Sequence, residues 1–229
     1  MYLKSNEIPI STDKVYEDML DKIINLQLEP GRKISENEMC AEYNVSRTVI
    51  RRVFTHLNSL NLVEIFPQRG TYISLIDVDY VNDVLFLRNA LEKECLKCII
   101  QYPEKDKIIK KLEANLKKQK KFYKCTDYPK EYQILDEEFH NIIIQSVNRK
   151  ALMEIMEQPL IHMKRWRNLY VKESHNLYKI IDEHEKILED IKNNDLNSAQ
   201  KSLEEHIRTI VEASIETTKS HSEYFNFSD

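Results

Sequence analysis

Apolar residues recur every three to four positions along most of this chain, a spacing typical of helices that bury one face. The first such run covers residues 13–28 and ends in a turn at 29–31, where Pro and Gly stand side by side. The helical spacing stops between residues 62 and 74, where two short runs of strand type flank a Pro-Gln-Arg-Gly turn. It resumes at Asp79. The pattern therefore predicts a mainly α protein with one small β-hairpin.

The helical spacing from Asp79 onward predicts an all-α bundle. Six or seven segments are separated by short breaks, so neighbouring helices are expected to run antiparallel. Residues 75–80 are expected to form a linker in which the polar stretch Asp77-Val78-Asp79 can cap the next helix. We therefore expect two domains, residues 1–75 and residues 76–229. The breaks between the bundle helices are expected at Pro103, 127–129, Asn148, Pro159, Ser174 and 193–195.

Residues 35–74 have the order helix, tight turn, helix, hairpin. The second helix follows Ser46, whose hydroxyl is expected to accept a hydrogen bond from an amide of the first turn. A charged face opposite its apolar face carries Arg47, Arg51 and Arg52. A recognition helix presents such side chains to base edges and phosphates in the major groove of DNA. This order predicts a helix-turn-helix that binds double-stranded DNA.

The hairpin has the features of a wing. A short edge strand is expected at 32–34, and Arg69 lies at the hairpin tip beside Gly70, which can take a positive φ. Residues 1–75 hold nine Lys and Arg against ten Asp and Glu, so this half of the chain is not basic overall. Its cations cluster at Arg32-Lys33, on the recognition helix and at Arg69. The local electrostatic potential steers contact with DNA more than the net charge of the domain does.

The same segment resembles the winged helix-turn-helix of GntR-type transcriptional regulators. The resemblance rests on Ser46-Arg47-Thr48-Val49-Ile50-Arg51 at the start of the recognition helix and on Arg69-Gly70 at the wing tip. It implies that the helix enters the major groove and that the wing tip follows the minor groove. The residues expected to contact DNA are Arg47, Thr48, Arg51, Arg52, Arg69 and Gly70.

Composition narrows the class of protein. Only two glycines occur in 229 residues, so glycine-rich phosphate loops and dinucleotide fingerprints are excluded. No run of about 18 apolar residues is present and the N-terminal residues lack an apolar signal segment, so we expect a cytoplasmic protein without membrane association. The four cysteines are expected to be reduced thiols, with Cys95 and Cys98 buried as small apolar residues.

Three of the expected bundle helices carry ionisable groups on their apolar faces. These are Asp136 with His140 one turn later, His184, and His206 in the last helix. Burial without a partner would cost roughly 2–7 kcal/mol for each neutral polar group and more for an ion. A divalent cation removes most of this cost, because imidazole nitrogens and a carboxylate oxygen suit zinc, nickel, iron or manganese. The alternative for each histidine is a hydrogen bond to a backbone carbonyl.

These residues carry a second resemblance. Asp136-x-x-Phe139-His140, Glu183-His184 and His206 are similar to the metal-ligand pattern of the all-helical FCD domain of the FadR subfamily of GntR regulators. The resemblance implies Asp136, His140, His184 and His206 as the ligands of one ion. Together with the N-terminal motif it covers nearly the whole chain.

Arg88 interrupts the apolar stripe of the first bundle helix, and a buried guanidinium needs an anion. One possible partner is an Asp or Glu of a neighbouring helix. The other is the carboxylate of a small effector that also coordinates the metal, which family members with an arginine here favour. Trp166, with Arg165 and Arg167, either lines the same pocket or lies on an interface or surface helix.

Together these features indicate a homodimeric transcription factor, expected to be a repressor, that binds a pseudo-palindromic operator and responds to a small organic acid. A dimer is expected because two recognition helices related by a twofold axis read half-sites about one helical turn apart. One alternative is a metalloenzyme, either a hydrolase or a lyase, that uses the site of three histidines and one aspartate. The others are a sensor of the metal itself and a protein in which the ion is purely structural. The enzyme is disfavoured because no further general base or nucleophile is evident.

Overall fold

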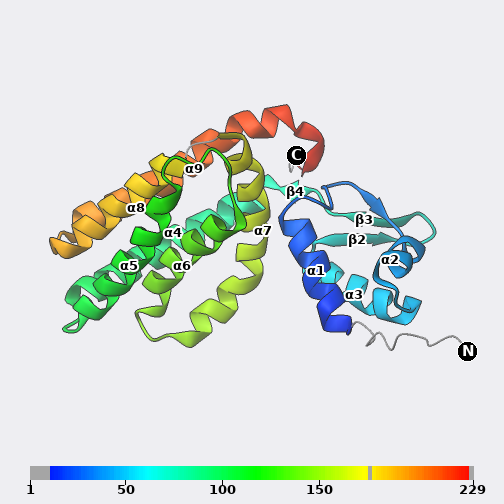
Figure 1. The fold of residues 1–229 in the computed structure, drawn as a ribbon, viewed down its shortest axis with the longest axis horizontal. Coiled ribbons are helices and arrows are strands. Elements are labelled where there is room, and N and C mark those ends of the chain that lie inside the picture. Colours follow the sequence, from blue (N-terminus) through cyan, green and yellow to red (C-terminus); the bar gives the residue numbers. More distant parts are fainter. Residues whose placement is uncertain (1–10, 175–176, 227–229) are drawn as a thin grey trace, which may run out of the picture. The chain divides into compact units, whose positions relative to one another are not determined.

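The computed structural model describes residues 11–174 and 177–226, which form two compact units (Figure 1). The first, which we call the winged-helix unit, contains the described residues up to Ile76 together with Ser222–Asn226. The second, which we call the helical unit, runs from Asp77 to His221. The protein is mainly helical with a small antiparallel sheet, which confirms the predicted fold class. No helix of the described residues is long and apolar enough to cross a membrane.

The winged-helix unit packs three helices against a three-stranded sheet. The strand order is β1-β3-β2 and both pairs are antiparallel, with Ile65 opposite Thr71. The apolar faces of the helices meet in a core that includes Met19, Ile50 and Leu57, each fully buried. The elements are α1 (Thr12–Ile24), β1 (Lys33–Ile34), α2 (Glu36–Tyr43), α3 (Arg47–Ser59), β2 (Val63–Phe66) and β3 (Gly70–Ile73).

Left-handed residues and polar caps set the helix ends in this unit. α1 ends at Ile24, earlier than expected, because Leu26 has a φ of 60° and leaves the helical region. Asn44, with a φ of 51°, ends α2 in the tight turn before α3. Ser46 is the N-cap residue of α3, but its side chain makes no cap hydrogen bond, so that prediction was wrong. Ser46 is exposed, and water can satisfy the first amides of α3 instead.

A short strand replaces the expected linker at 75–80. β4 (Ile76–Asp77) forms a two-stranded sheet with β5 (Phe225–Asn226), which follows the 3-10 helix η2 (Ser222–Tyr224). The next helix then begins at once, because the Asp77 carboxylate accepts a hydrogen bond from the Tyr80 amide at 2.9 Å. The predicted cap is therefore confirmed, but the linker is shorter than expected.

Six α-helices form the described part of the helical unit. α4 packs against each of the other five, so it is the central helix of the bundle. α8 packs against α9, and α5 against α6, as expected for neighbours joined by short loops. The helices are α4 (Val78–Gln101), α5 (Lys105–Gln119) with the short 3-10 helix η1 (Lys120–Phe122), α6 (Lys130–Gln145), α7 (Lys150–Ser174), α8 (Leu177–Lys192) and α9 (Leu196–Ser220).

Asparagines rather than glycines separate helices in this unit. Asn148 (φ 51°) lies between α6 and α7, and Asn194 (φ 58°) between α8 and α9, so these predicted breaks are confirmed. The break expected at Pro159 is wrong, because α7 continues through it. Proline removes one backbone hydrogen bond, but Met156 and Met163 are buried on either side and hold both halves of α7 in the bundle.

The cysteines are free thiols, as predicted. Cys95 is buried on α4, whereas Cys98 is exposed, so the expectation that both are buried was wrong for Cys98. Cys98 is rotated about 60° from Cys95 around the helix axis. It lies on the side away from Leu96 and Ile99, which continue the buried face of α4.

Candidate DNA-binding surface and metal centre

The polar face of α3 lies on the surface of the winged-helix unit. Its predicted DNA contacts, Arg47, Thr48, Arg51 and Arg52, are all exposed. The opposite face is buried in the core, so helix packing alone fixes which side of α3 is accessible. A shallow groove on the exposed face is lined by Thr48, Arg51, Arg52, Thr55, His56 and Ser59.

Arg51 is held by the preceding helix. Its Nε donates to Oε1 of Glu36 on α2 at 2.7 Å, although 64% of the Arg51 side chain is exposed. This hydrogen bond raises the pKa of Arg51. It occupies the Nε donor and leaves the two terminal nitrogens able to reach a base edge or a phosphate. Glu36 thereby limits the number of conformations that Arg51 samples before it meets DNA.

The wing places an exposed arginine at its tip. Arg69 lies in the turn between β2 and β3, and its amide donates to the Phe66 carbonyl at 3.1 Å. Gly70 has a φ of 125°, which residues with a side chain rarely adopt. A Cβ on Gly70 would also lie 2.6 Å from Cε of Lys33 on β1. The Lys33 side chain is flexible and could move aside, so the positive φ is what favours glycine at the wing tip.

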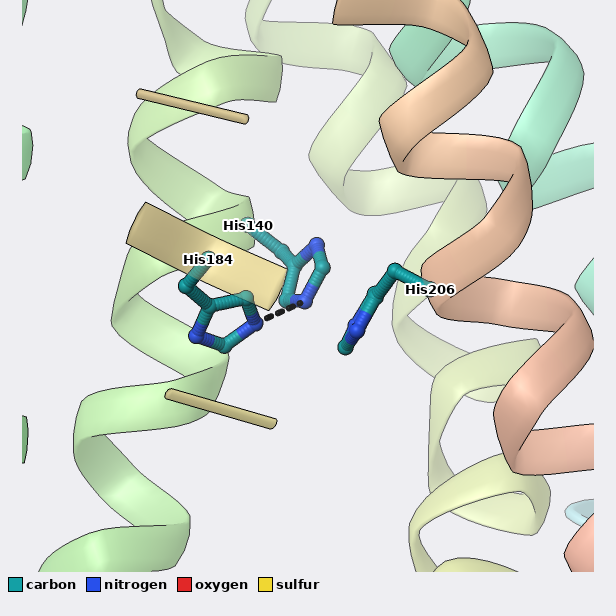
Figure 2. Close-up of side chains that lie close together, drawn as sticks. All are labelled: His140, His184 and His206. Carbon is teal, nitrogen blue, oxygen red and sulfur yellow. Dashed lines mark hydrogen bonds between the residues drawn. The ribbon is translucent and has the colours of Figure 1, made fainter. Parts of the chain in front are cut away.

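Three histidines from three helices meet in the core of the helical unit (Figure 2). His140 comes from α6, His184 from α8 and His206 from α9, and each is at most 2% exposed. One nitrogen from each ring lies within 4.8 Å of the other two. Phe139 stacks on the His184 ring with centroids 4.2 Å apart and so fixes its plane. The structure thus brings together three of the four predicted metal ligands.

Each of these histidines has an oxygen acceptor at Nδ1. Because carboxylate and amide oxygens only accept, each Nδ1 carries a proton, and in a neutral ring the lone pair is therefore on Nε2. The three pairs are His140 with Glu92 Oε2 at 2.8 Å, His184 with Gln119 Oε1 at 2.9 Å, and His206 with Glu183 Oε2 at 2.8 Å.

A chain of amides fixes the orientation of Gln119. Asn115 Nδ2 donates to the Leu135 carbonyl at 2.9 Å and to Glu138 Oε2 at 2.8 Å, so Asn115 Oδ1 is free to accept. Gln119 Nε2 donates to that oxygen at 2.7 Å, which turns Gln119 Oε1 toward His184. The hydrogen-bond network therefore determines that Nδ1 of His184 carries a proton.

The Nε2 atoms of the three histidines lie on the inner side of the cluster. His140 Nε2 and His184 Nε2 are 3.3 Å apart, and His206 Nε2 is buried without a hydrogen-bond partner among the described residues. Burial lowers the pKa of His184, and it lowers the pKa of His140 to about 4, so both rings are neutral at pH 7. Facing lone pairs repel unless a cation lies between them. The donor set therefore fits a divalent ion bound by neutral imidazoles.

Asp136 supplies an oxygen next to the histidines. Its Oδ1 is 3.7 Å from His184 Nε2 and accepts no hydrogen bond within the described part of the chain. Its Oδ2 accepts from Nη1 of Arg167 on α7. Burial opposes ionisation of this carboxyl, but the Arg167 charge more than offsets that and holds the pKa of Asp136 well below its usual range. Asp136 is therefore anionic and directs one unused oxygen toward the three imidazoles.

Arg88 is buried, as predicted, and its anionic partner is a side chain of this protein. Its Nε donates to Glu92 Oε1 at 2.7 Å, one turn along α4, so the partner belongs to the same helix and not to a neighbouring one. Burial alone would raise the pKa of Glu92, but His140 and Arg88 lower it to about 2. Glu92 thus bridges Arg88 and His140. Trp166, Arg165 and Arg167 are also buried, which excludes a surface position within this chain.

Sequence reasoning missed Glu92, Gln119, Glu183 and the role of Arg167. Gln119 lies in the lysine-rich run 117–121, which is exposed overall, yet Gln119 itself is fully buried. The available signal was its spacing, since it continues the apolar stripe of Leu112 and Leu116. Glu92 carries a local signal as well, because it lies one turn after Arg88 on α4, where i, i+4 side chains meet. Its second partner, His140, is set by how α4 and α6 pack.

Two protein families match this chain. Residues 11–73 match the family described as bacterial regulatory proteins, gntR family, and residues 83–209 match the FCD domain. The first match covers α1 to β3, including the exposed face of α3 and the wing. The second covers the three histidines and Asp136.

Individual proteins match over nearly the whole chain. An uncharacterized HTH-type transcriptional regulator in an unstable DNA locus of Streptomyces ambofaciens is 29% identical over 208 residues, 91% of this chain and 86% of that protein. The HTH-type transcriptional repressor RspR of Escherichia coli K12 is 23% identical over 217 residues, 93% and 92% of the two chains. The solved structure of E. coli McbR/YncC shares the fold with a TM-score of 0.69 at 19% identity, over 90% and 98% of the two chains.

Proposed function

Because the chain belongs to the GntR family of bacterial regulatory proteins and carries an FCD domain, we propose that its operator affinity is controlled by a small organic acid bound at a metal ion in the helical unit. Its relatives are transcriptional regulators, and the chain is likewise a transcriptional regulator and not an enzyme. The finer assignment is a cytoplasmic, homodimeric repressor of the FadR subfamily. The observation that carries the proposal is the convergence of three buried imidazoles whose Nδ1 atoms already donate to oxygens behind them.

His140, His184, His206 and Asp136 would hold the ion, and zinc, nickel, iron and manganese all suit this donor set. The bound ion supplies a Lewis acid that can take an oxygen of the acid as a further ligand. The oxygens of Glu92, Gln119 and Glu183 accept from Nδ1 of the three rings and so hold each ring with its Nε2 toward the centre of the site. These partners support a site that is already organised before an effector arrives.

On the DNA side, α3 is proposed to enter the major groove through Arg47, Thr48, Arg51 and Arg52, with Arg69 and Gly70 of the wing in the adjacent minor groove. The exposure of these side chains and the preorganised Arg51 support this assignment. Two copies of α3 in a homodimer would read a pseudo-palindromic operator. Repression is supported by RspR, which is described as a repressor.

The effector must bind one arrangement of the dimer better than another, since equal affinity for both would leave the operator affinity unchanged. The test is operator binding by fluorescence anisotropy with the full chain in three states: metal-loaded, chelated, and metal-loaded with a panel of small carboxylic acids. We expect an acid to change operator affinity only in the metal-loaded protein. His184→Ala should remove that response, while Lys186→Ala, an exposed residue of the same helix, should keep it.

Each other outcome selects a different function for the ion. If chelation alone changes operator affinity as much as any acid does, the ion itself is the signal. If His184→Ala lowers thermal stability but the folded fraction keeps its response to acid, the ion is structural and the proposed pocket is wrong.

A further inference from the structure

We propose that Arg167, with Tyr132 beside it, forms the subsite that receives the anionic group of the effector. The inference rests on the proposed function, because it names the part of the pocket that recognises the acid. It departs from the sequence-based expectation, which gave this role to Arg88. The assignment follows from which buried donors of the core are already used and which are not.

Arg167 is buried but only partly paired. It is 3% exposed, and its Nη1 donates to Asp136 Oδ2. Its Nε and Nη2 have no hydrogen-bond partner among the residues that the structure describes. An unsatisfied donor on a buried cation is costly, and the cost is relieved when an acceptor arrives. Arg167 therefore has unused capacity for an anion.

The two unused donors of Arg167 lie on one edge of the guanidinium. In an arginine, the Nε–H and one N–H of Nη2 point in the same direction and form a fork that matches the two oxygens of a carboxylate. The remaining nitrogen, Nη1, faces Asp136. Arg167 can thus hold Asp136 and a carboxylic acid at the same time, with a different edge for each.

Arg88 lacks this capacity because its Nε, one of the two donors that form the fork, is already used. Its Nε is 2.7 Å from Glu92 Oε1, and its Nη1 lies 3.1 Å from the sulfur of Met163. Glu92 is fully buried and also accepts from His140. A carboxylate that displaced Glu92 from Arg88 would leave a second buried anion without its partner. The geometry therefore assigns Arg88 to the support of His140.

Tyr132 adds a neutral donor to the same place. It lies one turn before Asp136 on α6, is fully buried, and its hydroxyl has no hydrogen-bond partner among the described residues. Asp136 and Arg167 are the two charged groups that act most strongly on it. The Tyr128 ring packs 5.8 Å from the Arg167 guanidinium and 5.8 Å from the Tyr132 ring, which closes the subsite on one side. The hydroxyl can donate to a second oxygen of the ligand.

Charge accounting indicates the class of ligand. Arg88 and Glu92 compensate each other, and Asp136 compensates Arg167 in the metal-free core. With a divalent cation held by the histidines, the core would gain two positive charges, and the carboxylate behind His206, Glu183, is partly exposed. A small carboxylic acid with one or two carboxylates and a second oxygen function balances that excess and satisfies both Arg167 and Tyr132.

The test uses acetate, glycolate, malonate and succinate as probes on the zinc-loaded full chain, with affinity measured by calorimetry and zinc content measured by elemental analysis. Arg167→Lys keeps the charge but removes the fork, and should weaken the best-binding acid roughly tenfold or more at unchanged zinc content. Tyr132→Phe keeps the ring but removes the hydroxyl, and should weaken binding of the same acid by about three- to tenfold. Lys164→Met, at a partly exposed position one turn earlier on α7, is the matched control and should leave the affinity unchanged.

The outcomes separate this inference from the proposed function. If the wild type binds none of the four acids, the proposed function and this inference both fail. If the wild type binds an acid and both Arg167→Lys and Tyr132→Phe bind it equally well, only the subsite is wrong. Loss of binding in Arg88→Lys without loss in Arg167→Lys would return the role to Arg88. Should Arg167→Lys fail to fold or to hold zinc, Tyr132→Phe decides alone.

Discussion

The two units of this protein place their charged residues in opposite ways. In the described part of the winged-helix unit, the core is apolar apart from Ser74, and the arginines proposed to contact DNA are exposed. In the helical unit, the proposed functional groups are themselves core residues: Arg88, Glu92, Asp136, His140, Arg167, His184 and His206. Function and stability can therefore be changed separately in the first unit, whereas in the second unit they depend on the same side chains.

Two ion pairs of equal length make the comparison concrete. Arg51 and Glu36 in the winged-helix unit, and Arg88 and Glu92 in the helical unit, both join Nε to Oε1 at 2.7 Å. The arginine side chain is 64% exposed in the first and 4% exposed in the second. The two pairs therefore contribute differently to stability despite their equal distances. Water screens the exposed pair and solvates either partner when the other is removed, whereas the buried pair has no such solvent.

The largest effect is expected from Glu92→Gln. The substitution keeps the shape but leaves the buried Arg88 charge without its anion, which should lower the free energy of unfolding of the helical unit by about 3–5 kcal/mol. Trp166, the only tryptophan in the chain and buried in α7, reports on this unit in a urea titration by fluorescence. Its midpoint should move to lower urea.

Glu36→Gln is the matched control for that measurement. It removes the anion from the exposed pair and should leave the Trp166 transition unmoved, since Glu36 belongs to the other unit. If Glu92→Gln and Glu36→Gln proved equally harmless to stability, burial would not be what distinguishes the two units.

The next effect concerns DNA alone. Arg51→Ala should weaken the specific operator by roughly 5- to 150-fold if Arg51 reads a base, because a good base contact is lost. Thermal stability should not change, since the side chain is exposed. Lys14→Ala, an exposed cation on α1, is the control for loss of charge. A small loss that is equal on operator and scrambled DNA would show that Arg51 touches only phosphate.

The comparison also explains how far the sequence could be interpreted. The winged-helix unit was largely predictable, because the periodicity of α3 separates its buried and exposed faces and Gly70 marks a backbone that side chains cannot follow. His140, His184 and His206 were predictable as polar residues on apolar stripes.

What the sequence could not supply was the partner of each buried group. Glu92 joins Arg88 on its own helix to His140 on α6, and Arg167 reaches Asp136 from α7. The Glu92–His140 and Arg167–Asp136 pairings both depend on how separate helices pack, which periodicity does not encode. Pro159 was misjudged for the same reason, since burial on both sides of it keeps α7 continuous.

The smallest expected effect is a pH dependence of the metal-free helical unit. Burial lowers the pKa of His140, the charge of Arg88 lowers it further, and Glu92 and Asp136 oppose both, which leaves it at about 4. His184, which faces His140, His206 and Asp136, also has a lowered pKa. Between pH 6.5 and about 4 the unfolded chain therefore binds protons on these histidines that the folded unit does not. Stability must fall as the pH falls through that window.

Lowering the pH from 7 to 6 in the presence of a chelator should cost roughly 0.7 kcal/mol through His140 alone, measured as a shift of the Trp166 unfolding transition. His140→Gln removes this titration, so its transition should depend less on pH than that of the wild type. A wild-type transition that moved to higher urea on acidification would mean that His140 is protonated in the folded core. The neutral Nε2 that the metal site needs would then be absent.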